Sequence, residues 1–309
     1  MAAGDIAFPN LGIYLTNVPK GIYIGNFFIA LYGVIIAIGM ILGLTLGNHE
    51  SDRLGNPKDT VWELAFPLIF FSVLGARVYY VIFFWDYYKA NPKEILDIRG
   101  GGLAIYGGVI VGFLVTYIFT RIKKIGYFRM MDCVVMGLLV GQIIGRWGNF
   151  TNREVFGGYT DNLVAMRLPL EAVRSRDVTA ELMSHVTDGV NYIQVHPTFL
   201  YESVSNAILL LIMWLYRKHK KFDGEIMLMY LGGYGIIRFV IEGIRTDQLK
   251  IGHTGIAVSQ MLGIILFVFA VICEIIWRIR IAKTEGNKEG GTAEIITEKT
   301  DEKEPEKGA

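Results

Sequence analysis

Cysteine, clustered charge and metal-ligand spacing are all scarce in this chain, and each scarcity excludes a class of protein. Cys133 and Cys273 are the only cysteines among 309 residues, and each lies inside an apolar run, so we expect no disulfide framework. Charged residues make up 19% of the chain with a net charge of +1. They are divided among short segments and form no basic domain, so we expect no nucleic acid as a partner. Histidines, cysteines and carboxylates nowhere show metal-ligand spacing, so neither a metal nor another cofactor is expected.

Long apolar runs are what the chain has in abundance. Hydrophobic residues form 52% of it, and its mean hydropathy is +0.41. Runs of about 20 residues, the length that crosses the hydrocarbon core of a bilayer, recur along the chain. They cover residues 22–47, 61–84, 102–120, 130–145, 198–216, 224–240 and 255–277. The sequence therefore predicts an all-α polytopic membrane protein with about seven transmembrane helices.

The segments between the runs predict the remaining organisation. Residues 149–195 contain Pro169, many charges and short β-prone pieces at 163–168 and 191–195, which indicates a small α/β head outside the membrane. Residues 284–309 are rich in Glu, Lys, Gly and Thr, as is typical of a disordered tail. We therefore divide the chain into four membrane helices (1–148), the head (149–197), three membrane helices (198–283) and the tail (284–309).

Lysine and arginine in the short connections set the expected orientation. The connections after the third, fifth and seventh runs are rich in both residues: Arg121, Lys123, Lys124, Arg129, Arg217, Lys218, Lys220, Lys221, Arg278, Arg280 and Lys283. We expect these connections and the C-terminus in the cytoplasm, and the N-terminus and the head outside. Residues 1–20 lack the pattern of a removable signal peptide, so the first run is expected to stay as a signal anchor.

A dense polar cluster follows the fourth run directly. Residues 145–158 bring together Arg146, Asn149, Asn152, Arg153 and Glu154 at the end of an apolar stretch. The fourth run is short and rich in glycine, so we expect its outer end to open into this cluster. Uncompensated charge is costly at a membrane, and such groups mark functional sites. Arginine there indicates a bound anion, for which the phosphate of a phospholipid is the nearest source.

Other polar groups fall near the same outer plane. Tyr106 stands among glycines that let the backbone approach a ligand, and residues 196–202 open the fifth run with His196 and Glu202. Tyr234, Arg238, Glu242 and Arg245 are spaced to share one helix face, and Tyr32 lies in the first run. Structural roles compete with these readings: glycines such as Gly107 pack crossing helices, tyrosines form interfacial belts, and Arg238 with Glu242 forms an ion pair.

These motifs resemble one family closely. Residues 145–154 read Gly-Arg-Trp-Gly-Asn-Phe-Thr-Asn-Arg-Glu, which is similar to the signature of the prolipoprotein diacylglyceryl transferase family. Residues 101–108, 196–202 and 234–247 resemble its other motifs in the same order, and the likeness spans nearly everything from Tyr32 to Gln260. Some members carry histidine where this chain has Tyr106, which puts a histidine base in doubt here.

The resemblance implies an activity in the bacterial cytoplasmic membrane. It implies transfer of the diacylglyceryl group of phosphatidylglycerol to the lipobox cysteine in the signal peptide of a preprolipoprotein, which forms a thioether and releases glycerol 1-phosphate. The expected catalytic residues are Tyr106, Arg146, Glu154, Arg238 and Glu242, with Glu154 and Glu242 orienting the arginines. The expected substrate-binding residues are Tyr32, Gly107, Asn149, Gly157, His196, Glu202, Tyr234 and Arg245. The base that accepts the thiol proton stays open among Tyr106, His196, Glu154 and a phosphate oxygen.

Two other classes of membrane protein compete with this interpretation. A lipid scramblase or transporter could use the same arginines to bind headgroups, but we find no repeat that indicates paired transporter halves. An intramembrane protease needs a serine with a histidine, or paired aspartates, inside the spans. Ser72 and Ser259 have no intramembrane histidine as an obvious partner.

Overall fold

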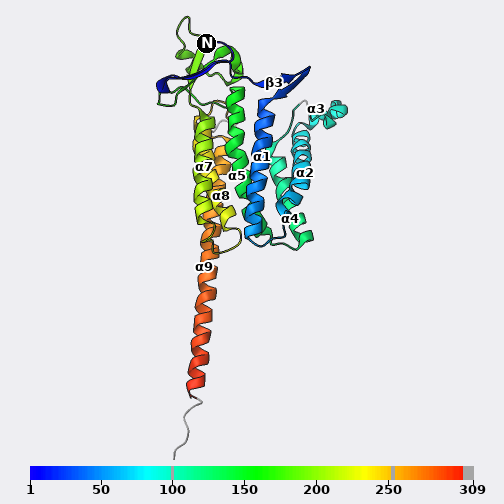
Figure 1. Cartoon of the computed structure of the whole chain (residues 1–309), viewed down its shortest axis with the longest axis vertical. Helices are drawn as coiled ribbons and strands as arrows, with labels where there is room; N and C mark the ends of the chain where they lie inside the picture. The colour runs from blue at the N-terminus through cyan, green and yellow to red at the C-terminus, as the bar shows by residue number, and fades with distance from the viewer. Residues whose placement is uncertain (99–100, 252–254, 302–309) are drawn as a thin grey trace, which may run out of the picture.

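The structure, a computed structural model, describes residues 1–98, 101–251 and 255–301. It contains seven helices long and apolar enough to cross a membrane, which confirms the predicted class. They are α1 (Leu31–Arg53), α2 (Thr60–Phe83), α4 (Ile105–Lys123), α5 (Tyr127–Asn152), α7 (Thr198–Tyr216), α8 (Glu225–Ile244) and α9 (Val258–Asp301). These helices stand side by side as a bundle, with the head at one end and the distal part of α9 extending from the other (Figure 1).

The first predicted span is wrong in its early part. Residues 22–30 belong to an antiparallel hairpin of β3 (Gly21–Ile24) and β4 (Phe27–Ala30), and α1 begins only at Leu31. Gly25 supplies the left-handed turn with φ 61°, and the flanking residues are β-branched or aromatic, which favours strands. Hydropathy alone does not separate such a hairpin from the helix that follows it.

We expected the fourth span to open at the polar cluster, but the helix does not end there. Helix α5 continues through Arg146 and Asn149 to Asn152, and it ends at Arg153, whose φ is 57°. The charged and amide side chains find partners on other elements, so they do not break the helix. The segment 149–152, which we assigned to the head, is therefore helical.

The head contains a four-stranded antiparallel sheet in the order β2-β1-β5-β6. We predicted strands only between the fourth and fifth spans, and β5 (Met166–Pro169) and β6 (Tyr192–Val195) lie there. The other two, β1 (Ile6–Phe8) and β2 (Ile13–Leu15), come from the N-terminus, which the prediction missed. Because β1 pairs with β5, the N-terminus and the head lie on the same side of the bundle. Short elements complete this outer part: η1 (Pro9–Leu11), α3 (Trp85–Ala90), η2 (Pro92–Leu96), η3 (Leu170–Ala172), η4 (Ser175–Asp177) and α6 (Ala180–Ser184).

Glycines set the closest helix crossings in the bundle. A Cβ added at Gly43 of α1 would collide with the backbone of Gly137 on α5. A Cβ added at Gly107 of α4 would likewise collide with the backbone of Gly75 on α2. Small residues let membrane helices approach in this way. Gly107, which we expected to bind substrate, is therefore buried in a helix crossing.

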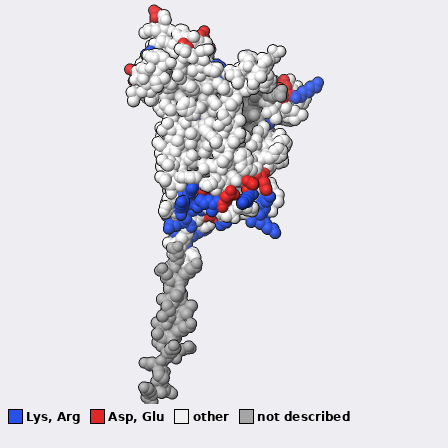
Figure 2. Space-filling model, viewed as in Figure 1, with Lys and Arg blue, Asp and Glu red and all other residues white. Residues whose placement is uncertain are grey.

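Charge is distributed unevenly between the two ends of the bundle. In the view of Figure 2, lysines and arginines gather at the end opposite the head, around the point where α9 leaves the bundle. Between the two ends lies a wide band without charge. Helix α9 includes residues 284–301 of the predicted tail. Residues 302–309 of the tail lie outside the described residues, as do Arg99 and Gly100, which precede the glycine motif.

Candidate active site

A cavity of about 480 Å³ runs between α1, α2, α4 and α5. Its walls are mostly apolar, and its polar residues lie toward the head: Tyr32, Gln142, Arg146 and Asn149. From Tyr32 to Gly47, both of which line it, α1 rises about 22 Å at 1.5 Å per residue. That length exceeds the ~15 Å depth of one leaflet, half of a hydrocarbon core of ~30 Å. The shape suits a lipid with a polar group at the outer end.

Arg146 lies at the polar end of this cavity and is held by a buried carboxylate. Its Nη2 donates to Oε1 of Glu202 at 2.5 Å, and its Nη1 donates to Oδ1 of Asn149 at 3.4 Å. The Glu202 side chain is 1% exposed, whereas that of Arg146 is 20% exposed. A guanidinium has five N–H groups, so Arg146 keeps donors for a ligand in the cavity.

Glu202 joins two helices because its second oxygen accepts from another arginine. Nη1 of Arg238, on α8, donates to Oε2 of Glu202 at 3.2 Å, and the Tyr234 hydroxyl lies 3.5 Å from Oε1. The carboxylate of α7 thus stands between Arg146 and Arg238. Sequence reasoning placed Glu202 among the substrate-binding residues but did not find this position, because its partners lie far away in the chain.

The predicted helix face on α8 exists as a chain of ion pairs. Arg238 Nη2 donates to Glu242 Oε2, and the same oxygen lies 3.6 Å from Nη1 of Arg245. Arg245 in turn makes two hydrogen bonds of 2.8 Å to Asp247. The spacing of four, four and three residues therefore brings these side chains together as predicted.

Glu154 does not contact Arg146 directly, contrary to our expectation that it orients this arginine. Its Oε1 accepts from Asn149 at 3.1 Å and from Asn152 at 3.3 Å. Its Oε2 accepts from Arg174 of the head at 2.6 Å. Asn149 therefore links the two, and Arg174 is a partner that the sequence analysis missed. Arg174 lies in a loop with no recognisable motif, so no sequence signal indicates it.

The junction of head and membrane contains Gly157 and His196. Gly157 donates to the carbonyl of His196 at 3.0 Å, and a Cβ added at Gly157 would meet the carbonyl of Ile244 and the His196 side chain. Burial lowers the pKa of His196 below its usual value. The imidazole is therefore neutral near pH 7, with Nδ1 3.2 Å from the Tyr201 hydroxyl.

The two tyrosines expected at the site occupy different positions. Tyr32 lines the cavity, and its ring covers Gly148, where a Cβ would come within 2.6 Å of it. Tyr106 lies in the first turn of α4, next to Ile105 of the cavity lining, and its hydroxyl makes no hydrogen bond to another described residue. Within the described parts of the chain, no three His, Cys, Asp or Glu side chains are grouped to hold a metal ion.

Comparison with known proteins agrees with this geometry. Residues 19–277 match the family described as prolipoprotein diacylglyceryl transferase. Phosphatidylglycerol–prolipoprotein diacylglyceryl transferase of Clostridioides difficile is 42% identical over 235 residues, which cover 76% of this chain and 86% of that protein. The protein of that name from Finegoldia magna is 38% identical over 255 residues, covering 82% and 93% of the two chains. The chain therefore belongs to the prolipoprotein diacylglyceryl transferase family.

Proposed function

We propose that this protein transfers the diacylglyceryl group of phosphatidylglycerol to the cysteine thiol of a prolipoprotein, the first step of lipoprotein maturation. The relatives carry this activity in their names. The observation that carries the proposal is Arg146, held by the buried Glu202 at the polar end of a long apolar cavity. In this position, the phosphate of a lipid would meet the arginine while an acyl chain fills the cavity.

The reaction is a displacement at the terminal glycerol carbon that carries the phosphate. The thiolate sulfur forms a C–S bond to this carbon, the C–O bond to the phosphate breaks, and glycerol 1-phosphate leaves with the electron pair. The thiol loses its proton in the same process. The greatest demand is therefore stabilisation of the negative charge on the leaving phosphate.

The arginine pair meets this demand. Arg146 and Arg238 share Glu202, and Glu242 holds Arg238 from the other side. These contacts fix both guanidinium groups before a lipid arrives, so little reorganisation is needed in the transition state. A planar fork of donors also matches two phosphate oxygens, which a lysine cannot do. Asn149 and Tyr234 add neutral donors beside them.

Three protein groups, His196, Tyr106 and Glu154, compete with a phosphate oxygen for the thiol proton. Neutral His196 has the protonation state of a base, although its place at the head junction serves packing as well. Tyr106 is another candidate, and a neutral phenol serves more readily as a hydrogen-bond donor than as a base. We assign Tyr106 the role of shaping the cavity mouth and donating a hydrogen bond.

The proposed setting is the bacterial cytoplasmic membrane, with the N-terminus and the head outside and the C-terminus in the cytoplasm. The concentration of lysine and arginine at the end opposite the head supports this orientation (Figure 2). The protein partner would be a preprolipoprotein whose signal peptide presents its lipobox cysteine at the outer end of the cavity.

A transfer assay tests the proposal. Purified protein is incubated with phosphatidylglycerol labelled in its acyl chains and a lipobox peptide, and a Cys→Ser peptide serves as the control. We expect a labelled thioether that resists hydroxylamine and forms only with the cysteine peptide. Movement of the lipid between leaflets of proteoliposomes without any thioether would favour a scramblase.

A further inference from the structure

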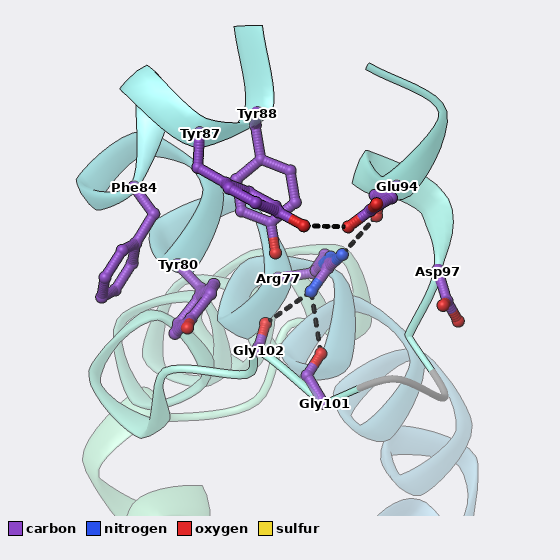
Figure 3. A pocket seen from close by; sticks show the side chains of 9 residues that line it. All are labelled: Arg77, Tyr80, Phe84, Tyr87, Tyr88, Glu94, Asp97, Gly101 and Gly102. Carbon is purple, nitrogen blue, oxygen red and sulfur yellow. Dashed lines mark hydrogen bonds between the residues drawn. The ribbon is translucent and has the colours of Figure 1, made fainter. Parts of the chain in front are cut away.

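Arg77 is a buried arginine toward the head end of the bundle, and the site described above does not use it. It lies near the outer end of α2 and is 6% exposed. Its Nε donates to the carbonyl of Ile95 at 2.9 Å, and its Nη2 to that of Glu94 at 2.5 Å. Its Nη1 donates to the carbonyls of Gly101 and Gly102 at 2.8 and 2.9 Å. Figure 3 shows the guanidinium at the centre of this segment.

Carbonyl dipoles and an aromatic ring surround the charge of Arg77. Its Cζ lies 5.1 Å from the centroid of the Tyr88 ring, and no ion pair among the described residues includes it. A carboxylate would satisfy the guanidinium with one side chain. Four carbonyls do so only if the main chain follows one particular path around the planar fork. Arg77 therefore fixes the course of residues 94–95 and 101–102 in the connection between α2 and α4.

This connection leads directly into the helix that carries Tyr106. The amide of Ala104 donates to the carbonyl of Ala76, the neighbour of Arg77, at 3.0 Å. One turn later, Gly107 packs against Gly75 of the same helix. The start of α4 is thus attached to α2 on both sides of Tyr106.

The geometry leaves Gly101 and Gly102 little freedom once Arg77 is in place. Gly101 and Gly102 have φ values of 93° and 71°, a region that favours glycine, and their carbonyls face the guanidinium. A Cβ added at Gly102 would lie 2.5 Å from Nη1 of Arg77. Ile105, which follows, lines the cavity.

We propose that Arg77 is a positioning residue for the transfer reaction. By binding the carbonyls of residues 94, 95, 101 and 102, it fixes the first turn of α4 and so holds Tyr106 next to Ile105 of the cavity lining. The proposal rests on the proposed function, because Tyr106 matters only if the cavity holds the reacting lipid. Arg77 itself touches no substrate.

The first test replaces the fork and keeps the charge. Arg77→Lys supplies a point charge that cannot bind four carbonyls at once, so we expect kcat to fall about three- to tenfold, no more than the loss expected for altering Tyr106 itself. The KM for phosphatidylglycerol should change less than about twofold, because Arg146 and Glu202 are untouched. Arg121→Lys, at the opposite, exposed end of α4, is the matched control and should match wild type. A rise in the KM for phosphatidylglycerol with an unchanged kcat would contradict the proposal.

A double-mutant cycle separates positioning of Tyr106 from a general structural role. In a Tyr106→Phe background, Arg77→Lys should reduce kcat by less than about twofold, because the group that Arg77 positions is already altered. Independent structural damage would multiply the two losses instead. Multiplied losses at equal protein levels would overturn the assignment.

Hydrogen exchange gives a readout that does not depend on activity. Amides of residues 101–107 should exchange faster in Arg77→Lys, while those of α5 and α7 should not change. Unchanged exchange at 101–107, or faster exchange throughout the bundle, would overturn the proposal. An inactive wild-type protein would refute the proposed function instead and would leave this measurement interpretable.

A second variant covers the case in which Arg77→Lys does not accumulate in the membrane. Gly102→Ala places a methyl group against Nη1 of Arg77 and the Tyr80 ring at a residue with positive φ. This variant displaces the segment that Arg77 binds by changing Gly102 and leaving the arginine in place. The same loss in kcat with little change in KM is expected, and wild-type kcat would contradict the proposal.

Discussion

Both ends of the bundle contain a buried glutamate shared by two arginines. At the outer end Glu202 binds Arg146 and Arg238, and at the inner end Glu50 binds Arg53 at 2.5 Å and lies 3.4 Å from Arg217. Both carboxylates are 1% exposed. Pairing and burial therefore do not distinguish a reactive site from a structural one.

Access to a cavity does distinguish the two ends. Arg146 lines the lipid-sized cavity, whereas neither Arg53 nor Arg217 is among its described lining residues. Arg53 also donates to the carbonyl of Arg217 at 3.3 Å, and the Arg217 guanidinium lies over the Trp214 ring. The inner triad thus ties α1 to the loop after α7, while the outer triad presents donors to a ligand.

The largest expected effect separates the two triads by one substitution in each. Arg146→Lys should reduce kcat/KM by about 10² or more, because a point charge cannot replace the fork that stabilises the leaving phosphate. Arg53→Lys makes the same change at the inner end and should cost less than about threefold. The measurement is the thioether assay at matched membrane levels. Similar losses in both variants would mean that the comparison is wrong.

The shared carboxylates provide the next test. Glu202→Gln and Glu50→Gln each remove a buried negative charge that two arginines share, so both should lower the thermal midpoint in detergent. We expect Glu202→Gln also to lose about 10-fold or more in kcat per folded molecule, whereas Glu50→Gln should keep its kcat. A fully active Glu202→Gln protein would remove this carboxylate from the arrangement of the arginines.

The pair Arg238 and Glu242 should behave as one unit. Because the two side chains are hydrogen-bonded, Arg238→Gln and Glu242→Gln together should resemble the worse single variant in kcat/KM. Ile236→Val, a neighbouring exposed position on α8, is a suitable control for expression and should leave activity unchanged. Strict additivity of the two losses would show that the contact does not matter for turnover.

Tyr106 should show a smaller effect, which sharpens the assignment of the mouth. If the phenol shapes the mouth and donates a hydrogen bond, Tyr106→Phe should reduce kcat about three- to tenfold, and Tyr106→His should stay active. The pH profile of kcat should then be the same in wild type and in Tyr106→His, with no ionisation near about 6.5 that appears only in the histidine variant. Complete inactivity of a folded phenylalanine variant with rescue by histidine would make Tyr106 the base.

The smallest expected effect concerns His196 and stability. Burial lowers the pKa of His196, so the folded state binds fewer protons at this site than the unfolded state does. Its contribution is present above the unfolded pKa of about 6.5 and is lost as the pH falls through the folded value. The thermal midpoint of wild type should therefore drop more between pH 7.5 and 5.5 than that of His196→Gln. An identical pH dependence in both proteins would contradict a neutral, buried imidazole.

The sequence predicted the spans well because a span depends only on local composition. About 20 apolar residues suffice to identify α7, whose bounds were predicted correctly as 198–216, and the spacing along α8 identified a real face. The β3–β4 hairpin was missed because its apolar residues look the same to a hydropathy window as those of α1. The strands β1 and β2 were missed because β2 pairs with β1, and β1 joins the sheet through β5, which lies beyond four membrane helices.

Within the site, the residue types were predictable and several partners were not. Glu154 was expected to orient an arginine of the site, but the carboxylate that holds Arg146 is Glu202, which the packing of α5 on α7 brings close. Such contacts depend on tertiary packing, which no local pattern encodes. Gly107 differs in the opposite way: it belongs to a motif expected to bind substrate, but in the structure it packs two helices together.

The pairing of Ala7 with Arg167 has a consequence for synthesis of the protein. The N-terminal strands leave the ribosome first, yet their partner strand appears only after α1, α2, α4 and α5 have been made. Closing so long a loop is slow, so the edge of β1 stays unpaired until the fourth span is in the membrane. During this interval the nascent head exposes an apolar edge. Maturation of the head therefore reports that the first four helices have been inserted.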